Sequence, residues 1–499
     1  MGNPLANNKT KNIQMRSTFL FIALIAATIA GAQNSAATKY AKTITPSDLK
    51  AKLTIIASAA MEGRETATEG QRKAAAYIEN YFKKLGLQPG NGNSYQMSFP
   101  VYKDSVTNFS FTVNGKEFKT GEDVATLGRN IPEGKWNVKD IVFASYGTTD
   151  SLVNNYDGLN AKGKWVLVLD YKTKEGASLY DIVSHARQQN AAGLLVLSPD
   201  FPKQNYKLEA GMRNTEEKGK SMPMFYVSNA VAEALLGKTP SASTIRGVYP
   251  ANLALNIEET TQHLQSTNVL GVLPGTDKKD EYVFVTGHYD HLGKRDSVIY
   301  YGADDDGSGT TSVLEIAEAF SKAKKAGHGP RRTMVFMTVS GEEKGLWGSE
   351  YYAANPIFPL DRTSVDLNID MVGRIDPDYK GDSTNYVYVI GEDKLSSDLF
   401  PISDSINKKY INLELDRRYN DPKDPNRFYY RSDHFNFAKN GVPVIFYFNG
   451  VHADYHKPTD TIDKINFDVM TKRVKLIYYT AWAMANRDDL LKRDIPLSH

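Results

Sequence analysis

Hydrophobic and polar positions alternate regularly from Asn268 to the end of the chain. Short apolar runs predict strands at residues 281–286, 333–339, 365–369, 386–390 and 442–448. Between them, apolar residues at helical spacing predict helices at residues 310–324, 347–354, 397–409 and 467–491. Strands and helices that alternate in this way favour an α/β fold, with a mostly parallel mixed sheet flanked by helices.

The pattern differs in the first half of the chain. Residues 47–87 have helical spacing, and the segment 86–92 is a break rich in Gly and Pro. Short apolar runs then predict strands at residues 141–144, 165–169 and 193–197, with a helix at 178–192. We therefore predict a β-rich insertion at 116–255 between two parts, 33–115 and 256–499, of one larger domain.

The first 32 residues are typical of a signal peptide. Arg16 precedes an apolar run from Phe19 to Ile29, and the small residues Ala30-Gly31-Ala32 follow it. Residues 1–32 are thus predicted to be removed on export to the periplasm or the medium. The alternative is an N-terminal membrane anchor, for which the apolar run is short.

Charge and cysteine content limit the partners and the metal ligands that the protein can use. Lys and Arg number 60 and Asp and Glu 58, a net charge of +2 that gives no reason to expect nucleic acid or an anionic membrane as a partner. The chain has no cysteine, which excludes disulfides and thiolate ligands. Any metal site must therefore use His, Asp and Glu.

Five polar motifs each follow a predicted strand or lie in the next loop. Their central residues are His288, Asp305, Glu343, Asp370 and His456. Loops beyond the carboxyl ends of strands form the sites of open α/β sheets. Imidazole and carboxylate groups suit zinc, and one carboxylate can bridge two ions that act on the same substrate. The pattern predicts metal-assisted hydrolysis.

Each motif also has a less specific interpretation. A single histidine at the end of a strand, such as His288, is often structural. The adjacent carboxylates Asp304, Asp305 and Asp306 repel one another and need either a cation or open water. His291 and His452 compete with the other histidines as ligands, although they lie outside the register of the five motifs.

The five motifs, in this order and spacing, resemble metallopeptidase family twenty-eight, the di-zinc aminopeptidases. The resemblance covers residues 40–90 and 257–490 and includes the lead-in Ala60-Met61-Glu62-Gly63-Arg64. It implies two zinc ions per chain, one held by His288 and Asp370, the other by Glu343 and His456, with Asp305 as the bridge. It also implies a cis peptide bond between Asp305 and Asp306.

Further roles follow from the same resemblance. Glu342 would be the general base, and Asp290 would orient His288 as part of the catalytic apparatus. Tyr429 and Ser432 match positions that bind the substrate or the tetrahedral intermediate. Residues 157–197 resemble a protease-associated domain, a module often inserted in exported peptidases.

The resemblance implies an exported zinc aminopeptidase that hydrolyses N-terminal residues from peptides through a hydroxide bridging the two metal ions. Alternatives are a carboxypeptidase or dipeptidase with the same metal site, a glutaminyl cyclase-like acyltransferase with a single zinc, and a binding-only relative of transferrin receptors. A carboxypeptidase needs a basic pocket, for which Arg374, Arg417 and Arg418 are candidates. Peptides are the only expected partners, with no nucleic acid and no membrane beyond export. Side-chain preference and oligomeric state stay open.

Overall fold

The computed structural model describes residues 35–497, except 128–130, 150–152, 171, 173–177, 205, 209–210 and 220. The predicted signal peptide, residues 1–32, lies outside the described residues. The chain divides into two compact units, one formed by residues up to Phe99 and from Gln265 onward, the other by Pro100–Leu264. The second unit contains the insertion predicted at residues 116–255. Within the described residues, none of the helices has both the length and the apolar character needed to cross a bilayer.

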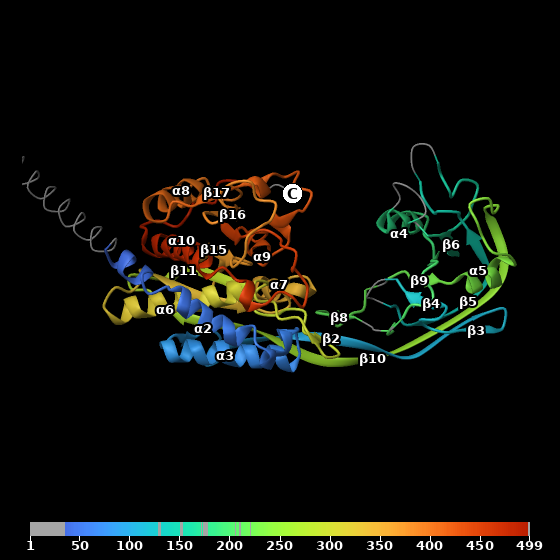
Figure 1. Cartoon of the computed structure of the whole chain (residues 1–499), viewed down its shortest axis with the longest axis horizontal. Helices are drawn as coiled ribbons and strands as arrows, with labels where there is room; N and C mark the ends of the chain where they lie inside the picture. The colour runs from blue at the N-terminus through green and yellow to red at the C-terminus, as the bar shows by residue number, and fades with distance from the viewer. Residues whose placement is uncertain are drawn as a thin grey trace, which may run out of the picture. The chain divides into compact units, whose positions relative to one another are not determined.

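A mixed sheet forms the centre of the first unit (Figure 1). Its strands are β10 (Gly247–Leu273), β11 (Lys278–His288), β14 (Arg332–Val339), β15 (Thr363–Ile369), β16 (Tyr386–Ile390), β17 (Glu414–Asp416) and β18 (Val444–Phe448). They lie in the order β17-β16-β18-β15-β11-β14-β10. Only the last residues of β10 pair in this part of the sheet. The four central strands β18, β15, β11 and β14 run parallel to one another. At the two sides of this group, β10 pairs antiparallel with β14 and β16 pairs antiparallel with β18, while β17 runs parallel to β16. The sheet thus confirms the predicted fold class.

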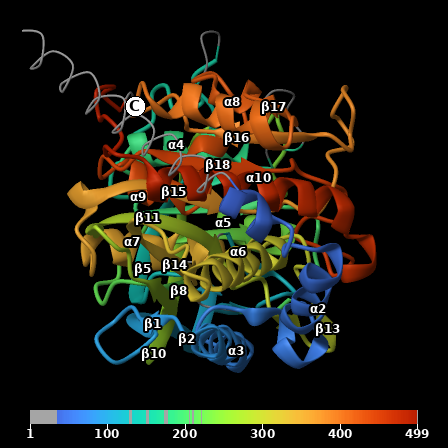
Figure 2. The ribbon, with the colours of Figure 1, turned by 90° about the vertical axis from the view of Figure 1, so that its left-hand side faces the viewer.

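Helices cover both faces of this sheet. One face packs against α2 (Pro46–Ile56), α3 (Glu69–Leu85), α6 (Gly307–Lys325), α8 (Leu399–Tyr410) and α10 (Phe467–Asn486). Figure 2 shows α6 and α10 beside each other. The other face packs against α7 (Trp347–Ala354) and α9 (His434–Ala438). Every residue of β14 and β15 is buried, as expected for strands covered on both sides.

Local sequence fixes where several helices begin and end. Thr45 caps α2 by accepting a hydrogen bond from the Asp48 amide, and Pro46 occupies the first helical position. The prediction for α10 was too long, because the helix ends at Asn486 rather than at residue 491. Asp488 and Asp489 follow Asn486, and negative charge is unfavourable at a helix C-terminus.

The smaller elements of the first unit are β1 (Gln88–Pro89), β12 (Lys294–Arg295), β13 (Val298–Ile299) and six short 3-10 helices, η1 (Ala59–Arg64), η3 (Glu342–Lys344), η4 (Leu360–Arg362), η5 (Arg418–Asn420), η6 (Phe428–Tyr430) and η7 (Ile462–Lys464). Most lie in the loops that join strands to helices. Two of them, η1 and η3, contribute to the site described below.

The second unit is a β-rich domain. Its elements are β2 (Gln96–Val113), β3 (Lys116–Phe118), β4 (Val124–Thr126), β5 (Gly134–Phe143), β6 (Trp165–Leu169), α4 (Leu179–Gln188), β7 (Gly193–Leu197), β8 (Met212–Arg213), β9 (Met224–Val227), α5 (Asn229–Leu236) and the first part of β10. The strands β5, β6, β7 and β9 run parallel in that order, and α4 and α5 belong to separate apolar clusters. The chain enters and leaves this unit through β2 and β10.

Candidate metal centre

The predicted ligands lie where the central strands end. His288 is the last residue of β11, and Asp370 directly follows β15. Glu343 lies in η3, just after β14, and Asp305 lies in the loop before α6. His456 comes from the loop between β18 and α10. Because the central strands are parallel, their carboxyl ends meet at one edge of the sheet, which brings these side chains together.

One group consists of His288, Asp305 and Asp370. The Nε2 atom of His288 lies 3.3 Å from Asp305 Oδ1 and 3.6 Å from Asp370 Oδ1. Ligand atoms of one tetrahedral zinc ion lie roughly 3.3 Å apart, because each is about 2.0 Å from the metal. Both distances from His288 Nε2 are therefore close to the spacing of two ligand atoms on one cation.

A second group uses the other oxygen of Asp305. The Nε2 atom of His456 lies 3.1 Å from Asp305 Oδ2 and 3.1 Å from Glu343 Oε2. Asp305 thus faces His288 through Oδ1 and His456 through Oδ2. This arrangement is the one that a bridging carboxylate needs. The peptide bond between Asp305 and Asp306 is cis, as the family resemblance implies.

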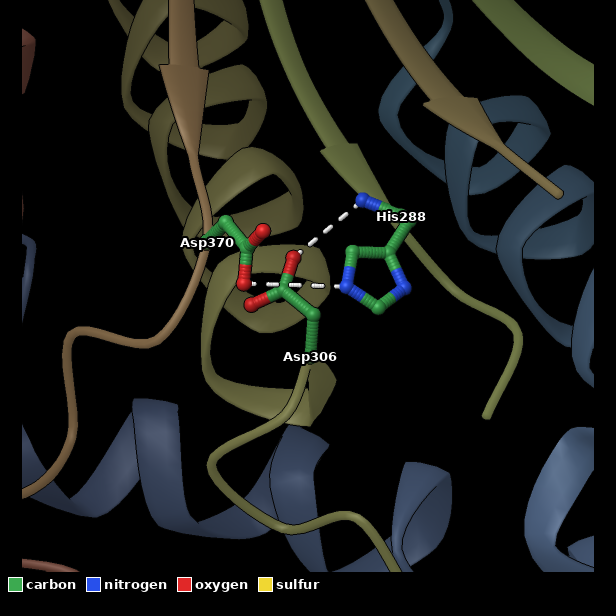
Figure 3. A group of neighbouring side chains, drawn as sticks. All are labelled: His288, Asp306 and Asp370. Carbon is green, nitrogen blue, oxygen red and sulfur yellow. Dashed lines mark hydrogen bonds and ion pairs between the residues drawn. The ribbon is translucent and has the colours of Figure 1, made fainter. Parts of the chain in front are cut away.

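The Asp306 carboxylate lies beside His288 and Asp370 (Figure 3), and its hydrogen bonds hold the loop. Its Oδ2 accepts a hydrogen bond from the His288 amide, and its Oδ1 accepts from the amides of Gly309 and Met371. Asp306 is also the residue that caps α6. These bonds join β11, α6 and the end of β15, and they orient the backbone from which His288 and Asp370 project.

Asp290 connects a predicted ligand to the predicted base. Its Oδ1 lies 3.7 Å from His288 Nδ1 and accepts a hydrogen bond from the Glu342 amide, while its Oδ2 accepts from the hydroxyl of Thr66. The Oε2 atom of Glu342 lies 3.9 Å from His288 Nε2. The Glu342 side chain is therefore held beside the first group.

Burial and neighbouring carboxylates favour the protonated form of Glu342. Burial, with the charges of Asp370, Glu343 and Asp433, raises the pKa of Glu342 well above its usual range, although His288 opposes this shift. A carboxyl group with a raised pKa can take up and release a proton near neutral pH.

The negative charges of the site favour the binding of a cation. Burial opposes ionisation of Asp305, but His288 and His456 outweigh it and hold the pKa of that carboxyl well below its usual range. Burial also opposes protonation of His456, but Asp305 and Glu343 raise the pKa of its imidazole to about 10. Without an ion, protons on the imidazoles would supply the positive charge that the carboxylates require.

Several ligand atoms have no hydrogen-bond partner within the described residues. Among these buried atoms are His288 Nε2, Asp305 Oδ2 and Glu343 Oε1. A buried polar atom without a partner is costly unless an ion or water satisfies it. The side chain of His456, in contrast, is 38% exposed, which leaves the centre open to solvent on that side. The donor set and its unpaired atoms therefore fit two zinc ions with an open face.

Arg64 supports the centre from the N-terminal part of the chain. Its guanidinium group is fully buried and donates hydrogen bonds to the carbonyl groups of Ile56, Tyr289, Tyr301 and Gly302. Sequence analysis gave Arg64 only as part of the family lead-in. Its contacts show that it joins η1 to the end of α2, to the residue after β11 and to the loop just before the acidic triplet.

Asp460 and His452 hold the acidic triplet from the opposite end of the sequence. Asp460 Oδ2 accepts hydrogen bonds from the amides of Asp304 and Asp305. His452 Nε2 lies 3.2 Å from Asp304 Oδ2. His452, a lower-ranked candidate, therefore faces Asp304 rather than Asp305. His291, the other such candidate, lies 2.8 Å from Glu343 Oε1 through its Nδ1 atom.

Ser432 and Tyr429 have different surroundings. The hydroxyl of Ser432 donates a hydrogen bond to Asp370 Oδ2 and accepts one from the Asn368 amide group. Tyr429 packs against the rings of Tyr430, His434 and Phe435. Their predicted contact with the substrate stays a prediction.

Tyr455 is a residue that sequence analysis did not identify. Its ring stacks on that of His456 at a centroid distance of 3.9 Å, and its pKa is raised first by burial and then by the charges of Asp305 and Glu343. Its position directly before His456 was the only available signal.

Part of the chain matches a known protein family. Residues 268–481 match the family model described as Peptidase family M28. This segment is similar to the members of that family. It contains all five residues predicted to bind metal.

Three curated relatives are similar to parts of the chain. A probable zinc metalloprotease of Pyrenophora teres is 27% identical over 259 residues, which cover 44% of this chain and 51% of the relative. A probable leucine aminopeptidase of Arthroderma otae is 27% identical over 57% of this chain and 70% of its own length. A probable glutamate carboxypeptidase of Arabidopsis thaliana is 33% identical over 30% of this chain and 22% of its own length. The chain thus spans about half the length of the first of these relatives.

A solved structure shares the fold. The aminopeptidase from Aneurinibacillus sp. strain AM-1 superposes with a TM-score of 0.59 and 19% identity, covering 92% of this chain and 99% of that one. This likeness shows a common α/β architecture.

Proposed function

We propose that this protein is an exported zinc-dependent aminopeptidase that uses two zinc ions per chain. The observation that carries the proposal is the position of Asp305, which faces His288 through one oxygen and His456 through the other. His288 and Asp370 would hold one ion, and Glu343 and His456 the other. When bound, the ions would polarise the scissile carbonyl group and make an attacking water acidic.

The side chains of the protein would supply the remaining steps. The Glu342 carboxylate would take the proton from the attacking water and deliver it to the nitrogen of the leaving amine. Asp290 would keep Glu342 in place through its backbone amide. Ser432 would hold Asp370 so that its other oxygen faces His288. Burial of these groups excludes bulk water from the proton transfer.

The charge of the site supports action at the N-terminus of a peptide rather than the C-terminus. Carboxylates surround the centre, and they attract the ammonium group of a free N-terminus and repel a C-terminal carboxylate. The arginines suggested for a carboxypeptidase pocket already have acidic partners. Arg374 pairs with Asp454, Arg417 with Glu392 and Arg418 with Asp416.

Kinetic assays on matched substrates test the proposal. Amino-acid and dipeptide amides with a free N-terminus should be cleaved, and the same compounds with an acetylated N-terminus should not. A chelator should abolish the activity, zinc should restore it, and elemental analysis should find two zinc ions per chain. Cleavage of blocked peptides at the C-terminus would instead support a carboxypeptidase. A single zinc per chain together with cyclisation of N-terminal glutamine would support the glutaminyl cyclase alternative.

A further inference from the structure

His291 lies three positions beyond His288, and the fold directs its ring into the interior. The ring is fully buried, and the His291 amide donates a hydrogen bond to the Arg64 carbonyl group. Gly302 packs closely on the ring, because a Cβ atom at Gly302 would lie 2.5 Å from both Cγ and Cδ2 of His291. The backbone around the ring therefore leaves little freedom to its orientation.

One nitrogen of this ring faces the second ligand group. His291 Nδ1 lies 2.8 Å from Glu343 Oε1 and 3.7 Å from Asp305 Oδ2. One ligand atom from each of these three residues lies within 4.8 Å of the others. His291 is thus as close to Glu343 as His456 is, but it approaches the other carboxylate oxygen.

The contact between His291 and Glu343 is short but is not a well-formed hydrogen bond. Within the described residues, His291 Nδ1, Glu343 Oε1 and Asp305 Oδ2 all have no hydrogen-bond partner. Buried polar atoms that lie this close together without bonding to each other are expected where a cation lies between them. His288 Nε2 is in the same situation, because Asp305 Oδ1 lies 3.3 Å away and the described part of the chain offers it no hydrogen-bond partner.

Burial alone does not bring a histidine nitrogen close to a carboxylate oxygen without a hydrogen bond between them. The ring of His434 is also buried, and among the residues that the structure describes its two nitrogens have no hydrogen-bond partner. However, it stacks on the Phe446 ring and lies edge-on to Tyr429. His434 is therefore a core residue, whereas His291 faces two carboxylates.

We propose that His291 is a further metal ligand, which binds through Nδ1 the ion assigned to Glu343 and His456. This inference rests on the proposed two-ion function. The second ion would then have two imidazoles, Glu343 and the bridging Asp305 as ligands. The first ion would have one imidazole, Asp370 and the same bridge. A set of four protein ligands resembles a closed zinc site, so the second ion should bind more tightly than the first.

X-ray absorption at the zinc edge of the wild-type protein loaded with zinc tests this assignment directly. Three histidines shared by two ions give an average of about 1.5 imidazoles per zinc, whereas the two-histidine set gives about one. A value of about 1.5 supports the proposal, and a value of about one overturns it. Because this measurement uses the unaltered chain, it does not depend on the folding of a variant.

A variant gives an independent measurement. His291→Asn keeps a hydrogen-bond donor near the position of Nδ1 but removes the imidazole. We expect zinc and cobalt titrations of the metal-free variant to show a loss of affinity of at least about 10-fold at one site. The absorption of cobalt at that site should change as well. His328→Asn, at an exposed position, should bind both ions as the wild type does.

The outcomes separate the two proposals. If His291→Asn binds two ions with wild-type affinity and cobalt absorption, His291 acts only as a neighbour of Glu343 and the inference is wrong. If the wild-type protein itself binds fewer than two ions, the proposed function fails first.

Discussion

Ser432 donates its hydroxyl hydrogen to Asp370 Oδ2 over 2.7 Å, while Asp370 Oδ1 faces His288. We predict that Ser432→Ala lowers the affinity for one of the two zinc ions by about 10- to 100-fold, because the ligand loses the bond that orients it. Competition with a chromophoric chelator measures this affinity. The exposed Ser297→Ala serves as the control. Equal zinc affinity in Ser432→Ala and the wild type would contradict the assignment.

The base assignment predicts a separation between metal binding and turnover. Glu342→Gln should retain both ions, because the predicted ligand atoms belong to other side chains, and should reduce kcat by about 10²- to 10⁴-fold. Steady-state kinetics and elemental analysis on the same preparation measure the two effects. Glu350→Gln, at an exposed position on α7, is the matched control. A fully active Glu342→Gln enzyme would show that another group moves the proton.

The hydrogen bonds of Asp306 lead to a prediction about the stability of the folded protein. Asp306→Ala removes the acceptor of three backbone amides, those of His288, Gly309 and Met371. Each buried amide that loses its partner costs about 1–3 kcal/mol, so the free energy of unfolding should fall by at least about 3 kcal/mol. Denaturant unfolding monitored by circular dichroism measures this change. Asp306→Asn, which keeps a carbonyl oxygen, should lose less. Equal losses in the two variants would show that these bonds do not stabilise the loop.

The buried carboxyl group of Asp366 is expected to make the stability of the protein depend on pH. Burial raises the pKa of this carboxyl group from 3.8 to about 8, although the Thr286 hydroxyl, 2.8 Å away, opposes the shift. The folded chain keeps a proton that the unfolded chain releases above about pH 4. The stability that this group contributes is therefore present at low pH and is lost as the pH rises from about 4 to about 8.

Asp366→Asn removes this ionisation and keeps the shape of the protonated acid. We expect the variant to gain stability relative to the wild type as the pH rises from 5 to 8. Urea unfolding of both proteins at a series of pH values gives the difference. Asp361→Asn, at an exposed position, should show no such trend. A difference between Asp366→Asn and the wild type that stays constant with pH would mean that Asp366 is ionised in the folded protein.

Sequence analysis identified the residues of the candidate metal centre because their positions obey a simple rule. His288 and Asp370 end parallel strands whose apolar runs are visible in the sequence, and parallel strands bring their ends to one edge. The length of β10 was not predicted, because its apolar residues form no single run and its partners β5 and β14 are distant in sequence.

The supporting contacts could not be predicted for a related reason. Arg64 reaches Gly302 across more than two hundred positions, and nothing in the local pattern around either residue indicates the contact. His291 ranked low because it lies outside the register of the five motifs, and the sequence gives no sign that its ring faces Glu343. Such information depends on side-chain packing, which appears only once the chain is folded.

The hydrogen bonds of Arg64 have a practical consequence for the preparation of fragments of this protein. The segment that carries the family match starts at residue 268, so an expression fragment cut there would keep every predicted ligand and lose this guanidinium group. Three carbonyl oxygens, those of Tyr289, Tyr301 and Gly302, would then face an empty space in the interior. Recombinant fragments should accordingly begin ahead of Pro46, with the early helices included.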